Sequence, residues 1–190
     1  MVMSKTQTAP GALEFVREFV NTADLEAGED RLDSPAALVA WLAERGLVDG
    51  GTAAGPTDLR RAIELREALR AILLAHADHS PEDRAAPGGV LDAAARRARL
   101  RVAFAEDGRS RVVADADGVD GALGRLVAMA HSAQADGTWE RLKACPWHSC
   151  RWAFYDHTKN HSGRWCTMDV CGNRAKAAAY RRRQASSAPA

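Results

Sequence analysis

Hydrophobic residues recur every three or four positions along most of the first 136 residues, which is the spacing of amphipathic helices. The pattern predicts a helix over residues 11–22. A second helix should start after the capping residue Ser34, with Pro35 in its first turn, and stop at Gly46. A longer helix begins near residues 56–58. These segments indicate a body that is mostly α-helical.

The pattern changes after a break rich in proline and glycine, which is followed by a short helix over residues 90–97. Residues 100–104 then alternate apolar with other side chains, and residues 111–114 are β-branched. The turn-forming run Glu106–Gly108 between them predicts a β-hairpin, and a last helix begins near Asp120. We therefore expect a mainly α fold with a small antiparallel β-hairpin.

The only four cysteines lie in the last third of the chain, in two Cys-x4-Cys pairs separated by fifteen residues. Each pair can form a chelating turn, and the intervening segment can bring the pairs together, so the spacing predicts one structural zinc site. The predicted ligands are Cys145, Cys150, Cys166 and Cys171. Four thiolates leave zinc no open coordination position, and the body carries no catalytic motif, so we expect no enzyme.

Two disulfides, or four unrelated free thiols, are the alternatives to a metal site. Residues 1–10 lack the apolar core of a secretory signal, however, and no apolar run approaches the ~18–20 residues of a membrane helix. We therefore expect a cytoplasmic protein, in which thiols stay reduced.

A second alternative replaces one cysteine with a histidine, because His157 and His161 have His-x3-His spacing. Only six residues separate Cys150 from His157, against about 12 in a two-Cys two-His finger. The spacing thus favours four thiolates and leaves the histidine set open.

Around these ligands, residues 152–155 predict a strand and residues 164–165 predict a return strand that delivers Cys166. Thr167 can cap the following helix, which carries Cys171. A loop, a hairpin and a helix start sharing one metal form a treble-clef-like zinc finger. We place this finger at residues 140–184, behind an α-helical sensing or dimerisation domain at residues 10–136.

Charge separates the two regions further. Residues 141–190 carry ten Lys/Arg against two Asp/Glu, a net charge of +8, whereas the whole chain is +1. Residues 1–140 are therefore at −7, and such asymmetry indicates an acidic body joined to a segment that binds a polyanion. The basic residues expected to contact double-stranded DNA are Arg174, Lys176, Arg181, Arg182 and Arg183.

The cysteine segments also carry a resemblance. The stretch from Cys145 to Cys150, the aromatic run Trp152–Asp156 and the tetrapeptide Cys171–Arg174 resemble the CGNR zinc-finger family, named for that tetrapeptide. Its members are described as bacterial stress-induced transcription regulators with a larger N-terminal domain, called ABATE. The resemblance thus implies a zinc-dependent regulator of transcription.

Two short runs resemble motifs of the ABATE domain, namely Phe19–Thr22 and Leu65–Arg70. If that domain senses a small-molecule effector, the resemblance implies Asn21, Thr22 and Arg66 as its polar contacts. Capping and packing are the alternative roles for these three residues.

Together these observations predict a DNA-binding transcription regulator, responsive to stress or to a ligand, that dimerises through its helical body. The alternative is an adaptor that binds RNA or protein through its zinc finger. DNA binding predicts a strong dependence on salt and on the basic residues, whereas a protein partner predicts dependence on the exposed aromatic and apolar side chains.

Overall fold

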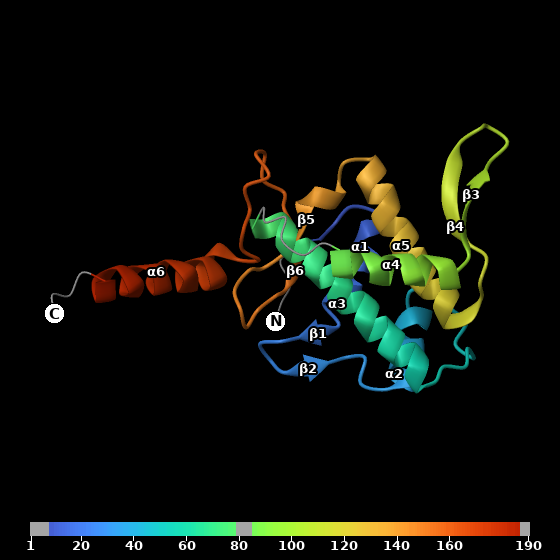
Figure 1. Ribbon diagram of the computed structural model, residues 1–190, viewed down its shortest axis with the longest axis horizontal. Coiled ribbons are helices and arrows are strands. Elements are labelled where there is room, and N and C mark those ends of the chain that lie inside the picture. The colour runs from blue at the N-terminus through green and yellow to red at the C-terminus, as the bar shows by residue number, and fades with distance from the viewer. Residues whose placement is uncertain (1–7, 79–84, 187–190) are drawn as a thin grey trace.

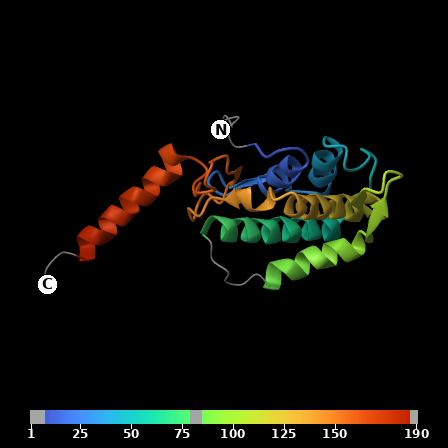
Figure 2. The same ribbon diagram turned by 90° about the horizontal axis from the view of Figure 1, so that it is seen from above.

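The structure is a computed structural model that describes residues 8–78 and 85–186 (Figure 1). Within these described residues the body contains five helices. Figure 2 shows α1 and α2 on one side of α3 and α5, and α4 on the other side. The bounds are α1 Leu13–Val20, α2 Pro35–Ala43, α3 Pro56–Asp78, α4 Ala85–Arg97 and α5 Gly118–Ala135.

The described strands form three separate antiparallel pairs. Strand β1 (Ala23–Asp24) pairs with β2 (Glu29–Asp30), and β3 (Leu100–Phe104) pairs with β4 (Ser110–Ala114) in the predicted hairpin. After the short 3-10 turn η2 (Trp139–Arg141), β5 (Leu142–Ala144) pairs with β6 (Ala153–Tyr155). The mainly α fold with a small hairpin is therefore confirmed.

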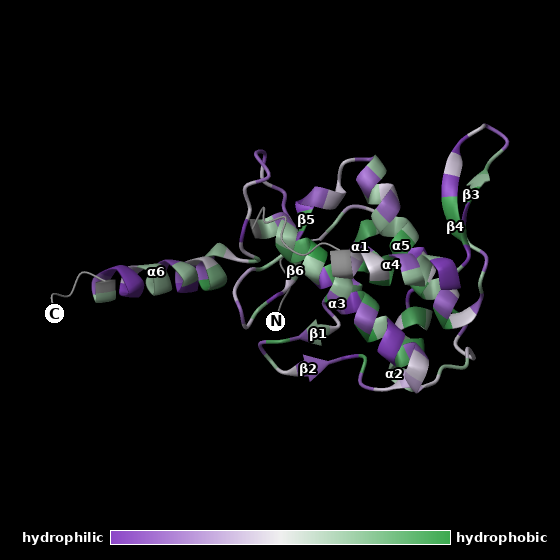
Figure 3. Cartoon of the chain, viewed as in Figure 1, coloured by the Kyte–Doolittle hydropathy of each residue, from purple (hydrophilic) through white to green (hydrophobic). Residues whose placement is uncertain are grey.

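The periodic apolar positions become the core, because each helix turns one stripe of them inward. Val16 and Phe19 of α1, Leu69 of α3 and Leu126 of α5 are fully buried in one hydrophobic cluster. The cap predicted at Ser34 is confirmed, since its hydroxyl accepts a hydrogen bond from the Ala37 N–H at 3.1 Å. Figure 3 shows this alternation of hydrophobic and hydrophilic residues along the helices.

The β5–β6 hairpin belongs to the same hydrophobic cluster as the helices. Leu142, Ala144, Ala153 and Tyr155 are all buried in it, and β5 packs against α3. The segment that carries the first cysteine pair is therefore held directly by the body.

Some predicted boundaries were wrong. Helix α4 begins at Ala85 and includes Pro87, because proline is tolerated in a first helical turn, where its missing N–H has no intrahelical partner. Residues 164–166 form no strand, and β6 pairs instead with β5, which precedes the first cysteine. The Thr167 side chain makes no capping hydrogen bond.

Two helical elements follow the loop that carries Cys166. These are the π-helical turn η3 (Met168–Gly172) and the helix α6 (Asn173–Ser186), which extends away from the body in Figures 1 and 2. Among the described helices, none combines the length and apolar character that crossing a membrane requires.

Candidate metal centre and nucleic-acid interface

The four cysteines converge on one point between the body and α6. Cys145 and Cys150 lie in the loop that joins β5 to β6, Cys166 lies in the loop before η3, and Cys171 lies within η3. Their Sγ atoms are all within 4.8 Å of one another. The cluster thus brings together two sequence segments as the spacing predicted, and it can hold one metal ion.

The sulfur separations fit a tetrahedral zinc site. Cys150 Sγ lies 3.5 Å from Cys166 Sγ, which lies 3.6 Å from Cys171 Sγ. A Zn–S distance of about 2.3 Å gives sulfur–sulfur separations of about 3.8 Å in a tetrahedron. A disulfide needs about 2.05 Å, and all four cysteines are free. The donor set and its spacing therefore fit zinc rather than two disulfides.

Burial of the thiols adds a second reason to expect a metal. All four cysteines are at most 6% exposed, and Trp147, Trp152, Phe154 and Trp165 pack around them. Hydrogen bonds from the neighbouring thiols lower the pKa of Cys145, and its thiolate in turn helps to raise the pKa of the other three. A divalent cation would offset the repulsion that keeps the remaining thiols protonated.

The histidines lie outside this cluster. His157 Nε2 lies 3.0 Å from the Thr8 carbonyl oxygen, and His161 Nε2 accepts a hydrogen bond from Arg141 Nε at 2.8 Å. His148 stacks on Trp147. In the described residues the metal-ligating group consists of cysteines alone, so the geometry favours four thiolates over a histidine substitution.

A buried ion pair shapes the loop between the two halves of the cluster. Lys143 Nζ donates to Asp156 Oδ2 at 2.7 Å and to the Gly163 carbonyl at 2.9 Å, while the Gly163 N–H donates back to Asp156 Oδ2 at 2.8 Å. A Cβ on Gly163 would lie 2.6 Å from Asp156 Oδ1, so only glycine fits there. This network closes the 157–163 loop and leads the chain back to Cys166.

The network also fixes the charge of the carboxylate. Burial by itself raises the pKa of Asp156, but hydrogen bonds from Lys143 and Thr158 outweigh it and lower the pKa to about 2. Sequence reasoning missed this pair. An alternating strand pattern that placed a lysine and an aspartate on one buried face could have indicated it.

The basic residues predicted to contact DNA all lie on α6, three or more residues beyond Cys171. Most of them are exposed along this helix: Lys176, Arg181, Arg182 and Arg183. Arg174 is partly buried, and its Nη1 donates to Glu26 Oε1 at 2.6 Å, in the loop between β1 and β2. The ion pair joins the start of α6 to the acidic body.

The three predicted effector contacts hold the body together. Asn21 ends α1 and exchanges two hydrogen bonds with the Ala153 backbone, at 2.8 Å from its Nδ2 and 2.7 Å to its Oδ1. Thr22 Oγ1 accepts from Arg66 Nη1 at 3.2 Å, and the same guanidinium makes two hydrogen bonds to Asp30. These contacts link α1 and α3 to β2 and β6.

Burial raises the pKa of Asp30, yet the Arg66 and Leu32 hydrogen bonds prevail and lower it. Both groups of this pair are therefore charged at neutral pH. An effector role for Asn21, Thr22 and Arg66 stays a prediction.

Sequence reasoning assigned no role to Arg70, although it lies in the same matched run. Its Nη2 donates to the Val20 carbonyl at 2.7 Å and its Nη1 to the Arg151 carbonyl at 2.9 Å. An arginine side chain that is only 3% exposed thus connects α1 to the finger through backbone oxygens.

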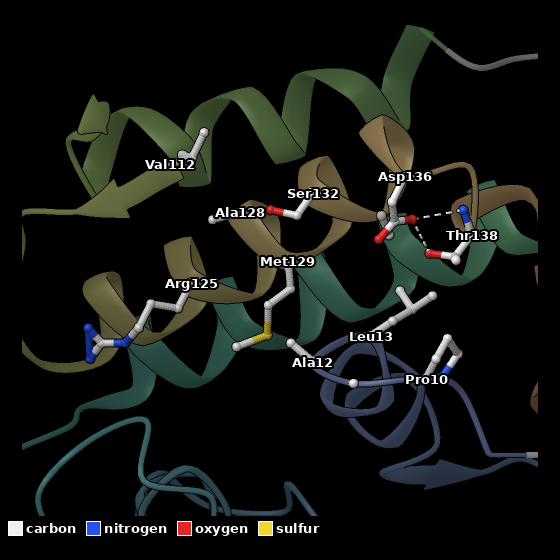
Figure 4. A pocket seen from close by; sticks show the side chains of 12 residues that line it. Pro10, Ala12, Leu13, Val112, Arg125, Ala128, Met129, Ser132, Asp136 and Thr138 are labelled. Carbon is white, nitrogen blue, oxygen red and sulfur yellow. Dashed lines mark hydrogen bonds between the residues drawn. The ribbon is translucent and has the colours of Figure 1, made fainter. Parts of the chain in front are cut away.

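Cavities lie both beside the cysteine cluster, where Asp156 and Cys166 line one, and on the helical body. One of about 380 Å³ is lined by the start of α1, by α5 and by β4 (Figure 4). Leu13, Met129 and Val112 give it an apolar wall, and the Arg125 guanidinium lies at one end, where it donates to the Leu47 carbonyl. None of the three predicted effector contacts lines this cavity.

A buried cluster of four cysteines, fused to a helical body and followed directly by an exposed basic helix, defines a zinc-finger protein with a structural metal site. Comparison with known families matches a profile to each of the two parts of the chain. The family profile named ABATE, described as a putative stress-induced transcription regulator, matches residues 13–140, and the profile of the CGNR zinc finger matches residues 141–184. The chain belongs to the ABATE family.

Both profiles agree with the resemblance seen in the cysteine segments, and neither describes an enzyme. No curated protein matches this chain.

Proposed function

We propose that this chain is a bacterial, cytoplasmic transcription regulator that binds double-stranded DNA through α6. One structural Zn²⁺, held by Cys145, Cys150, Cys166 and Cys171, fixes the start of that helix. The observation that carries the proposal is an exposed basic helix that begins at a metal ligand and extends away from an acidic body.

The dimensions and charges of α6 suit duplex DNA. Its 14 residues span about 21 Å at about 1.5 Å per residue, and the major groove admits a helix of this kind. The duplex carries one negative charge per about 1.7 Å, so the exposed Lys176 and Arg181–Arg183 would neutralise several phosphates. The acidic body, at −7, would be repelled, which leaves α6 as the face that approaches.

Arg174 would have a role in both the free protein and the complex. Its ion pair with Glu26 competes with a phosphate for the same guanidinium. The pair is half-exposed, so solvent screens it and exchange of one partner for the other costs little. Arg174 would thus help to orient α6 in the free protein and bind phosphate in the complex.

The body would supply sensing of stress or of a ligand, with residues 10–136 as that domain and residues 140–184 as the finger. The four-thiolate site has no open position for a substrate, so we infer no catalysis. The alternative partner is RNA or a protein. The observation that favours it is the exposure of Met168, Val170 and Tyr180, which are 43–58% exposed along η3 and α6.

The test is selection of genomic DNA fragments on the zinc-loaded protein. We expect enrichment of a shared sequence that a Lys176→Glu, Arg181→Glu variant fails to retain. On a selected fragment, that variant should also make the slope of log affinity against log salt less steep by about 2. The matched control is Arg60→Glu on α3, whose exposed side chain lies far along the chain from the finger.

Zinc content and circular dichroism show whether each variant is folded. Uniform or absent retention by a folded, zinc-loaded protein would sink the proposal. Binding that is insensitive to salt but is lost on Met168→Ser or Tyr180→Ser would favour the protein adaptor, and selection of RNA over duplex DNA would favour the RNA adaptor.

A further inference from the structure

The β3–β4 hairpin extends beyond the helical body, as Figure 1 shows at the yellow-green end of the molecule. Strand β4 packs closely against α5, whereas β3 makes far fewer contacts with the helices and forms the outer edge. An isolated two-stranded hairpin is marginally stable in water, and an open strand edge invites a further strand.

One face of this hairpin is apolar and only partly covered. Leu100, Val102 and Phe104 alternate along β3 and share that face with Val112 of β4. Val102 is 57% and Phe104 is 74% exposed, although both are large hydrophobic residues. A hollow of about 390 Å³ separates Val102 and Val112 from the end of α5, so the helix leaves the outer half of the face open.

The backbone of β3 has free hydrogen-bonding groups at the same positions. The Ala105 N–H donates to the Arg109 carbonyl at 2.9 Å, which makes this a hydrogen-bonded pair at the end of the hairpin. Bonded and non-bonded pairs alternate in an antiparallel ladder. Leu100, Val102 and Phe104 therefore direct their N–H and C=O groups away from β4, towards the open edge.

A second copy of the same strand fits this edge in one register. A two-fold axis at Val102 places Val102 opposite Val102 of the second copy, and it places Phe104 opposite Leu100. Arg101 then faces Ala103. The register thus avoids placing like charges directly opposite each other, which would be destabilising. The same axis joins the two apolar faces into one, in a self-complementary interface.

We propose that the chain forms a homodimer by antiparallel pairing of β3 with β3 of a second copy, centred on Val102, to give a four-stranded sheet. The pairing satisfies the free backbone groups. It also places Val102 beside Val102, and Phe104 beside Leu100, of the second copy. A five-residue strand buries little area, so the dimer is weak and dissociates on dilution. It does not depend on DNA binding and stands or falls separately from the proposed function.

The first test is the molar mass of the full zinc-loaded chain by light scattering and sedimentation. Wild type should pass from monomer to dimer between roughly 1 and 200 µM, as expected of a small interface. Val102→Lys should remain monomeric throughout. Leu25→Lys, which makes the same change at an exposed leucine of another hairpin, should dimerise like wild type.

The second test reads the register by cross-linking. Val102→Cys should form a covalent dimer under mild oxidation, because the two-fold axis brings this position next to itself. Phe104→Cys should not, although it is more exposed, since its mate lies four residues away along the partner strand. A monomeric wild type, a dimer that survives Val102→Lys, or equal cross-linking of both cysteine variants would overturn the proposal.

Discussion

Lys143 and Asp156 show how much a single pair of charged residues determines at the metal centre. Their side chains are 3% and 1% exposed, so neither charge has water to compensate for a lost partner. Pairing, four backbone partners and the Thr158 hydroxyl make both charges tolerable. The order of the 157–163 loop, and hence the position of Cys166, depends on this pair.

We therefore expect Lys143→Met to lower the free energy of unfolding by about 3–5 kcal/mol, because it leaves Asp156 charged and buried without its partner. Adding Asp156→Asn should recover part of that loss. Urea unfolding of the four proteins in a double-mutant cycle measures the coupling. Strictly additive effects would contradict the assigned role of the pair.

Asn21, which lies in a run matched to the family motifs, is a second residue whose side chain supports the finger. Its side-chain amide completes the edge of β6 by exchanging two hydrogen bonds with the Ala153 backbone. Asn21→Ala should thus lower the free energy of unfolding by about 1–3 kcal/mol, since two buried backbone groups lose their partner. Asn160→Ala, at an exposed asparagine, is the control and should change it by less than about 0.5 kcal/mol.

A near-neutral Asn21→Ala would show that the side chain does not stabilise the fold. In that case its role as an effector contact would gain weight, and binding assays with candidate ligands would be the next measurement.

Among the elements, those of the finger differ in what holds them. Strands β5 and β6 share the core of the body, whereas η3 and α6 depend on the cysteine cluster and on contacts such as the ion pair between Arg174 and Glu26. An isolated helix of 14 residues is marginal in water. Metal binding should therefore stabilise the second half of the finger selectively.

Removal of zinc with a chelator should leave α1–α5 and the β5–β6 pair folded while α6 and residues 157–172 lose order. Hydrogen exchange resolved by residue measures this, and amides of β6 should keep their protection. Restoring zinc should restore protection in α6. Loss of protection throughout the chain would instead show that the metal supports the whole fold.

The elements also show which predictions could be made from sequence. Helices with regular apolar spacing, such as α1 and α5, were predicted to within a few residues, and so was the β3–β4 hairpin. The pairing of β5 with β6 was missed because β5 is a three-residue strand next to a helix, too short for alternation to register. The cysteine cluster was predictable because chelation imposes a fixed spacing, whereas Arg70 and Asn21 act through backbone atoms that sequence patterns do not encode.

In the whole molecule, the boundary between the two family profiles runs through a shared core. It falls between residues 140 and 141, yet Leu142 and Tyr155 beyond it are buried among helices before it. Each side therefore lacks part of its own interior if separated.

A fragment of residues 141–190, loaded with zinc, should consequently fail to reach the native β5–β6 structure, because the apolar face of the hairpin would be left in water. Residues 1–140 alone should be less stable than the whole chain. Circular dichroism and amide nuclear magnetic resonance spectra of each fragment measure this. A fragment 141–190 whose amide shifts match those of the full chain would contradict it.

The contact of Asn21 and Arg70 with the backbone of the finger has a consequence for inheritance. A gene that acquired only the CGNR segment would lack the codons for the side chains that support its strands. Asn21, for example, lies more than a hundred positions before Ala153, the residue that it supports. Recombination at the boundary would separate them. The body and the finger are thus expected to descend together as a single unit, and changes at Asn21 or Arg70 would have to be tolerated by both.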